Sequence, residues 1–336
     1  MRTTGGGKKT MAQDSSVGER LAALSAVEDD LASPEARKAL RQGLGDSSNY
    51  VVERAAQFIA RTEDAAYTEP LVKAYWRLKR NPLKKDPGCL GKTAIVKALV
   101  ALEHADADLF RDGIVYEQIE PKFFGEADSA AELRGACALG LVDQVPALEV
   151  LNRCATLLVD PCVLARSGAA QALGILSQPE GAPLLRLKLL QGDEKPEVMG
   201  ECCAALLKLD RAGGLEFVAR FLFDGDSDLC VQAALAVAES RLPGTFELLR
   251  RTWERRVEEA VRESLLLCIG LLRTPESRDF LLSIIRPSDL KSAEDALKAL
   301  KLHGTDAEQR QAVDKAIDAT GEPRLRRVFL DEWGLG

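Results

Sequence analysis

A short helical pattern recurs along most of this chain and constrains its fold more than any other feature. The clearest copy runs from Ala165 to Gly174. It has a small residue first, a small pair four and five positions later, and a small-plus-apolar pair seven and eight positions later. Apolar positions spaced in this way share one face of an α-helix. The pattern therefore predicts a helix whose small residues let a neighbouring helix approach closely.

The same frame occurs eight times, which predicts a repeat protein. Its copies begin at Val51, Gly91, Leu133, Ala165, Val198, Leu229, Val261 and Ser292, so the first two intervals are 40 and 42 residues and the later ones 31–33. Most copies have an aspartate five residues upstream, at Asp46, Asp86, Asp128, Asp160, Asp193 and Asp224. An aspartate there is expected to cap the helix, because its side chain accepts hydrogen bonds from unpaired backbone N–H groups.

A second amphipathic stretch precedes each regular frame, at 146–159, 181–190, 214–223, 246–255 and 277–285. Each unit is therefore expected to be a helix–turn–helix. One such hairpin cannot bury its apolar face alone, so neighbouring hairpins must stack. The predicted fold is all-α: an α-α superhelix, or right-handed solenoid, of about eight helical hairpins with helical caps at both ends.

The repeat resembles HEAT-type repeats, in the short bacterial variety found in phycobilisome-lyase-type proteins. The family motif D-x-x-x-x-V-R-x-x-A-A-x-A-L-G is matched best by Asp160, Ala165-Arg166, Ala169-Ala170 and Ala172-Leu173-Gly174. The resemblance covers about residues 34–303 and implies a fold rather than a function. It also implies that the motif arginine pairs with aspartate across the stack. That arginine is missing at Val52, Lys92, Met199, Cys230 and Ala293, which predicts an irregular ladder of pairs.

The organisation expected from these signals is a disordered tail over 1–17 and a single solenoid domain over 18–336. Within that domain, 46–130 holds the atypical long repeats, 131–303 the regular repeats and 304–336 a C-terminal cap. A helix over about 19–31 is expected to close the N-terminal end. The final amphipathic segment, 323–333, is expected to close the other end, with docking elsewhere as the alternative.

A reversal of charge marks the first long repeat. The chain has a net charge of −7, yet residues 73–97 contain eight basic side chains and one acidic one. The acidic stretch 103–132 follows and carries further aromatic residues. The two blocks either neutralise each other or form a dock for an acidic partner. The candidate binding residues are Trp76, Arg77, Lys79, Arg80, Lys84, Lys85, Lys92, Lys97, Tyr116, Phe123 and Phe124.

A second candidate surface comes from the sixth position after each frame start. These residues should point away from the packed helix pair, and they are Lys97, Leu139, Gln171, Ala204, Leu235, Leu267 and Lys298. Small and apolar residues dominate the middle of the series. They are either partly buried between repeats or form the floor of a groove that suits a helix or an extended peptide.

Little in the sequence indicates catalysis. The eight cysteines form no C-x-x-C pair, and only two histidines, His104 and His303, are present, so no metal site and no cofactor are expected. Gly91-Lys92-Thr93 imitates the end of a phosphate-binding loop, but Asp86 stands where that loop needs glycine. HEAT-like hydroxylases use His-Glu pairs, which this chain lacks.

The predicted function is a non-catalytic scaffold or adaptor that binds a protein or peptide partner through its curved surface. The alternatives are nucleic-acid or other polyanion binding through 73–97, or a lyase-like assembly chaperone; DNA-glycosylase-like activity is a further enzymatic alternative. Nucleic acid is an unlikely partner because the chain is acidic overall. A secretory signal and a long apolar run are both missing, so we expect a cytoplasmic protein that does not enter membranes.

Overall fold

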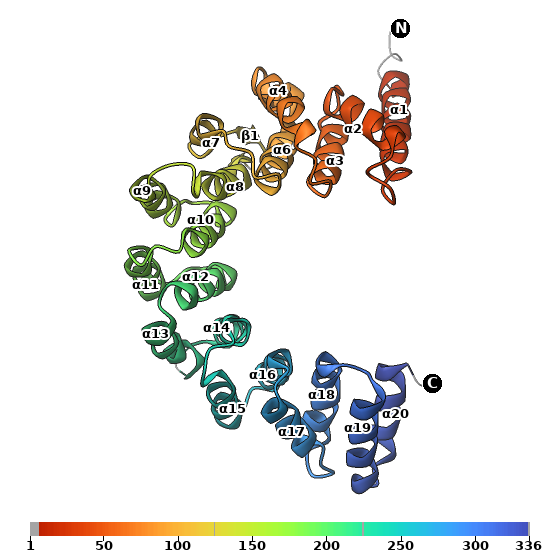
Figure 1. Cartoon of the computed structure of the whole chain (residues 1–336), viewed down its shortest axis with the longest axis vertical. Helices are drawn as coiled ribbons and strands as arrows, with labels where there is room; N and C mark the ends of the chain where they lie inside the picture. Colours follow the sequence, from red (N-terminus) through yellow and green to blue (C-terminus); the bar gives the residue numbers. More distant parts are fainter. Residues whose placement is uncertain (1–6, 124, 224, 335–336) are drawn as a thin grey trace. The chain divides into compact units, whose positions relative to one another are not determined.

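The computed structural model describes residues 7–123, 125–223 and 225–334. The chain forms two compact units, unit 1 (Met1–Leu176) and unit 2 (Ser177–Gly336), where the sequence predicts one domain over 18–336. Almost all regular structure in the described residues is helical (Figure 1). None of the described helices combines the length and the apolar character that crossing a membrane requires.

Unit 1 is built from helical hairpins, interrupted by a small hairpin of two strands that pair antiparallel, with Glu120 opposite Ala127. Its elements are α1 (Gly7–Ser25), α2 (Pro34–Leu44), α3 (Asn49–Ile59), η1 (Ala65–Tyr67), α4 (Thr68–Lys79), α5 (Pro82–Lys85), η2 (Pro87–Cys89), α6 (Leu90–Ala101), α7 (Ala107–Gly113), β1 (Ile119–Pro121), β2 (Glu126–Asp128), α8 (Ala131–Leu141), α9 (Ala147–Leu157) and α10 (Val163–Leu176). Figure 1 shows α3, α6, α8 and α10 in one row of the stack, and α4, α7 and α9 in the other.

Unit 2 repeats the same arrangement without strands in its described residues. Its elements are α11 (Gly181–Gln191), α12 (Pro196–Leu209), α13 (Arg211–Phe223), α14 (Ser227–Ser240), α15 (Thr245–Arg255), α16 (Glu259–Leu272), α17 (Pro275–Ile284), α18 (Leu290–Leu300), η3 (Lys301–His303), α19 (Ala307–Thr320) and α20 (Pro323–Trp333). The row that continues the frame consists of α12, α14, α16 and α18.

The predicted repeat is confirmed. Every frame start lies in a helix of the frame-bearing rows: α3, α6, α8 and α10 in unit 1, and α12, α14, α16 and α18 in unit 2. Both members of each small pair are completely buried, from Ala55 and Ala56 in α3 to Ala296 and Leu297 in α18. The pairs form the core because small side chains let adjacent helices pack closely.

Four of the frame aspartates act one step earlier than predicted. Asp86 is an exception that accepts hydrogen bonds from the N–H groups of Gly91 and Lys92 in the first turn of α6, and Asp224 lies outside the described residues. Asp46, Asp128, Asp160 and Asp193 each accept a hydrogen bond from the backbone N–H two residues later. This contact closes an Asx turn before the helix instead of capping its first turn. The aspartate therefore fixes the bend between the two helices of a hairpin.

The two long repeats contain the extra elements. The first insertion forms α5 and η2, and the second forms the β1–β2 hairpin, a feature that the all-α prediction lacks. At the N-terminal end, α1 begins at Gly7, inside the segment 1–17 for which disorder is predicted; residues 1–6 lie outside the described ones. At the C-terminal end, α20 packs on α18 and buries Leu325, Phe329 and Trp333, so it caps the stack.

Candidate functional site

The frame-bearing row of unit 1 carries a groove where the sixth frame positions were expected to lie. One part, of about 280 Å³, runs over α6, α8 and α10 and is lined by Lys97, Val100, Glu132, Gly135, Ala136, Leu139, Leu164, Ser167, Gly168 and Gln171. A second part, of about 320 Å³, runs over α3 and α6 and is lined by Glu53, Gln57, Ala60, Leu90, Thr93, Ala94, Lys97 and Glu132. The parts share Lys97 and Glu132, and together they are called the inner groove below. Lys97, Leu139 and Gln171, three of the predicted positions, line it.

The floor of the inner groove is hollow because two glycines let helix backbones touch. A Cβ added to Gly135 in α8 would lie 2.9 Å from the carbonyl oxygen of Leu164 in α10. One added to Gly168 would overlap the Gly135 Cα. No side chain rises between the two helices at this crossing, and the floor is therefore made of small residues.

Apolar side chains flank this floor. Leu164 and Ile175 of α10 are each about half exposed, at 50% and 55%, and Leu139 of α8 is half-buried. Leu164, Gly168, Gln171 and Ile175 follow helical spacing and so form one stripe. Exposed leucine and isoleucine beside a small-residue floor make a surface that an apolar helix face can cover.

The charges of the inner groove are concentrated where its two parts meet. Lys97 of α6 pairs with Glu132 of α8, with side chains 54% and 45% exposed. An exposed pair of this kind contributes about 0–1 kcal/mol. On α3, burial raises the pKa of Glu53, and the nearby Asp86 and Glu132 carboxylates raise it further. The end of the groove over α3 therefore has more negative than positive charge.

The basic residues of 73–97 have several different environments. Arg77 donates hydrogen bonds to the backbone oxygens of Leu44 (2.7 Å) and Asp46 (2.9 Å), so it ties α4 to the end of α2. Arg80 and Lys84 are exposed and Lys85 is half-buried, in the short connection around α5. The acidic stretch neutralises part of the remainder, as one of the two interpretations expects.

Lys79 illustrates that neutralisation. Its ammonium pairs with Asp112 of α7 and lies 5.3 Å from the ring centroids of both Trp76 and Tyr116. Cation–π contacts and an ion pair thus hold this lysine within the stack. Trp76 is 39% exposed, while Tyr75 beside it is buried, as expected for a pair of which one member is core.

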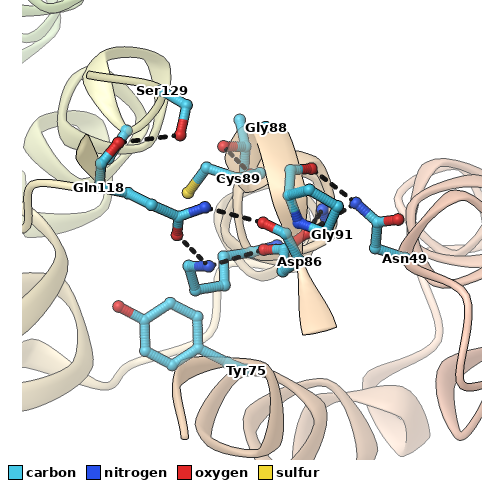
Figure 2. Close-up of polar contacts among 12 residues, drawn as sticks. Asn49, Tyr75, Asp86, Gly88, Cys89, Gly91, Gln118 and Ser129 are labelled. Carbon is cyan, nitrogen blue, oxygen red and sulfur yellow. Dashed lines mark hydrogen bonds and ion pairs between the residues drawn. The ribbon is translucent and has the colours of Figure 1, made fainter. Parts of the chain in front are cut away.

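Lys92 cannot belong to an exposed dock, which corrects the prediction for this residue. It is completely buried, and its ammonium lies 2.7 Å from Asp86 Oδ2 and 2.8 Å from Gln118 Oε1. Asp86 also accepts hydrogen bonds from Asn49 Nδ2 and from the backbone N–H of Gly91 (Figure 2). Because the Asp86 carboxylate holds Lys92, which lies in α6, the Gly-Lys-Thr sequence has a structural role.

The β1–β2 hairpin is fastened to the same buried network. Gln118 Nε2 donates to the backbone oxygen of Asp86 (2.8 Å), and Glu120 accepts from the backbone N–H of Gly88 (2.7 Å) and from Ser129 Oγ (2.9 Å). Burial raises the pKa of Glu120, but these hydrogen bonds together hold it below its usual range. At the tip, Phe123 is 93% exposed, and Phe124 lies outside the described residues.

The ladder of pairs implied by the resemblance is present in unit 1. Arg134 contacts both oxygens of Asp160 at 3.0 Å and pairs with Asp128, so it links its own repeat to the next one. Arg166 donates to the backbone oxygens of Asp160 and Pro161. Lys92 takes the arginine's place one repeat earlier, but it pairs with Asp86 of its own repeat instead of an aspartate of the next one. The ladder is therefore irregular, as the missing arginines predict.

Burial keeps most of the cysteine thiols unreactive. Seven of the eight cysteines are buried, and burial raises the pKa of thiols such as Cys89 and Cys154 to about 12. At neutral pH these thiols are protonated and poorly nucleophilic. Among the described residues no group of three histidine, cysteine or acidic side chains could hold a metal ion.

No family model and no curated protein matches the sequence. Solved structures that are similar include the complex of CpcE and CpcF of phycocyanin lyase from Nostoc sp. PCC7120, at 18% identity and a TM-score of 0.33 over 79% of this chain and 94% of that one. Human deoxyhypusine hydroxylase is similar at 17% identity and a TM-score of 0.30 over 80% and 98% of the two chains. An engineered protein is similar at 14% identity and a TM-score of 0.30 over 87% and 86%.

The fold assignment follows from the chain's own repeats. Helical hairpins recur in both units, each frame places a small pair in the core, and the Arg134–Asp160 pair joins neighbouring repeats of unit 1. These are the features by which the sequence resembles short HEAT repeats. The chain is an all-α protein of stacked helical hairpins, whose repeats resemble short HEAT repeats.

Proposed function

We propose that this protein is a non-catalytic adaptor that holds a helical segment of a partner protein in the inner groove. The observation that carries the proposal is the pair of adjoining hollows over α3, α6, α8 and α10, of which the one over α8 and α10 has a small-residue floor and apolar flanks. Consecutive repeats supply a long, shallow surface, which suits a helix better than a small substrate.

The chemistry of the groove defines the expected segment. Leu139 and Leu164 offer apolar contact at one end, so the partner helix is expected to present apolar side chains there. Glu53 and Glu132 outnumber Lys97 at the other end, so a lysine or arginine of the partner is expected over α3. An amphipathic helix with an apolar face and a basic residue near one end fits both requirements.

The proposal is tested by site-specific crosslinking in the native host. In one variant, a photo-crosslinking residue replaces Gln171 in the groove. In a second variant, it replaces Asn152, which is exposed on α9 in the other row. We expect one discrete protein adduct from position 171 and none from position 152. Adding Leu164→Glu is expected to remove that adduct, because Leu164 lies in the groove wall and is already half exposed, so the fold should persist.

Affinity for the captured partner provides the quantitative test. Burial of one leucine side chain contributes about 1.5–3 kcal/mol, and 1.4 kcal/mol corresponds to a tenfold change in affinity. Leu164→Glu should therefore weaken binding at least about tenfold, whereas Leu148→Glu on α9, another exposed leucine, should leave it unchanged. Equal effects of the two variants, or equal crosslinking from both rows, would show that the groove is not the binding surface.

A further inference from the structure

A pocket in unit 2 brings together two arginines and a histidine that the inner groove does not involve. It has a volume of about 230 Å³ and is lined by Arg273, Thr274, Pro275, Arg278, His303, Asp306, Glu308 and Gln309. Arg273 follows the end of α16, Arg278 lies in the second turn of α17, and His303 ends η3. Three separate elements thus direct cationic or protonatable groups to one cavity, called the Arg–His pocket below.

The start of α17 also opens on this pocket. Thr274 is its N-cap and accepts a hydrogen bond from the backbone N–H of Ser277. In turn, Ser277 Oγ accepts a hydrogen bond from the backbone N–H of Thr274. The first turn of a helix carries partial positive charge. That partial charge adds to the two guanidinium groups.

The acids that line the pocket offset these cations only weakly. Asp306 caps α19 and accepts the backbone N–H of Gln309 at 3.0 Å. Glu308 is 86% exposed at its side chain and lies 3.8 Å from Arg278, beyond hydrogen-bonding distance. Asp279, also exposed, lies 3.6 Å from Arg278 Nε.

The arginines have donors to spare. Arg278 Nε is buried, and no hydrogen-bond partner for it is present in the described part of the chain. Arg278 has only the long ion pairs with Asp279 and Glu308, and no ion pair of Arg273 is found among the described residues, although two carboxylates line the same pocket. A guanidinium presents several donors in a planar fork that matches an oxyanion, so free donors in a cavity indicate a ligand of that class.

His303 reports the charge in the pocket. Its Nε2 lies 3.3 Å from the hydroxyl of the buried Ser277. Burial lowers the pKa of His303, and the positive charges of Arg278 and then Arg273 lower it further. The arginines therefore outweigh Asp306 and Glu308 at the imidazole ring, and an anion bound between them would reverse that effect.

We propose that the Arg–His pocket binds an oxyanion, a phosphoryl or carboxylate group, held by Arg273 and Arg278 with His303 beside it. The ligand would occupy unit 2 while the inner groove of unit 1 holds a partner, so the two sites are distinct. The size of the cavity accommodates an anionic group together with part of the molecule that carries it.

The two histidines of the chain make a direct test possible. Their imidazole resonances are followed by NMR through a pH titration of the full chain, in chloride, in acetate and in inorganic phosphate at equal ionic strength. We expect phosphate or acetate to raise the pKa of His303 by about one unit, which is a tenfold change in proton affinity, and to leave His104 unchanged. A rise in the pKa of His303 in phosphate alone would identify a phosphoryl site, and a rise in acetate would identify a carboxylate site.

Arg278→Gln and Arg273→Gln are each expected to abolish the anion-dependent shift, while Arg251→Gln, at an exposed position of α15, retains it. The unperturbed resonance of His104 and the far-UV circular dichroism confirm that each variant is folded. If neither anion shifts His303 relative to chloride, or if the shift persists in both pocket variants, the proposal is overturned.

Discussion

At the scale of single residues, environment rather than residue type decides what a charge does. Lys92 and Lys97 lie on the same helix, α6, and each pairs with one carboxylate. Lys92 and Asp86 are both fully buried, whereas Lys97 and Glu132 are about half exposed. Removing one partner of a buried pair leaves an uncompensated charge in a medium that solvates it poorly, while an exposed charge returns to water.

This contrast predicts the outcome of two matched substitutions. Lys92→Ala should lower the free energy of unfolding by about 3–5 kcal/mol because it strands the Asp86 carboxylate. Lys97→Ala should lower it by at most about 1 kcal/mol. Urea unfolding followed by circular dichroism measures both, and similar losses for the two variants would contradict the structural role assigned to Lys92.

The sequence could not separate these lysines. The count of charges over 73–97 treats them alike, and the frame places Lys92 one position after a repeat start without showing its partner. Asp86 lies six residues away, but Gln118, which completes the cage, comes from the irregular second insertion. Long-range contacts of that kind have no local signal, whereas the sixth frame position, which predicts Lys97, Leu139 and Gln171, follows from helix geometry alone.

At the scale of the element, the periodic part of the chain is predictable and the insertions are not. The final helix, α20, has the predicted bounds of 323–333, and the frame helices contain every predicted repeat start. The β1–β2 hairpin is not predicted, because its strands have three residues each, are rich in charge and lack alternating apolar positions. Contacts with Asp86 and Gly88 hold it in place instead.

Two glycines in different surroundings are expected to respond to alanine in opposite directions. Gly168→Ala in α10 forces a methyl group into the backbone of α8 at Gly135, and such overpacking costs about 1–3 kcal/mol. Gly18→Ala in α1 meets open space and should stabilise the chain by about 0.5–1 kcal/mol, because alanine is the better helix former. Thermal and urea unfolding measure the two; a neutral Gly168→Ala would show that the α8–α10 crossing can widen.

At the scale of the whole molecule, uniform periodicity conceals the division into units. The frame starts at Ala165 and Val198 are 33 residues apart, within the regular range, although the boundary between the units falls between them at Leu176 and Ser177. A repeat pattern records only contacts between neighbours. How those contacts group into compact units is a property of the assembled side chains, which the pattern does not contain.

Stability against acid is a second property of the whole molecule, since both units contain carboxyl groups with lowered pKa values. In unit 1, burial raises the pKa of Asp128, but its hydrogen bonds outweigh burial and hold the pKa below its usual range. In unit 2, contacts with Lys298 and Lys291 lower the pKa of Glu263. A lowered pKa means that the unfolded chain binds protons more readily. The stability from these groups is present above the pKa of an unfolded carboxyl, roughly 4, and is lost as the pH falls through the lower folded values.

Two other groups modify this profile. His303 has a lowered pKa, so its contribution is lost as the pH falls through the pKa of an unfolded histidine, roughly 6.5. Glu53 has a raised pKa and acts in the opposite direction, because its protonation favours the folded state. We therefore expect the urea midpoint to decline slightly between pH 7 and 5 and steeply below pH 4. Asp128→Asn should flatten the steep part, and a midpoint that is constant down to pH 3 would contradict the hydrogen bonds and ion pairs assigned to Asp128 and Glu263.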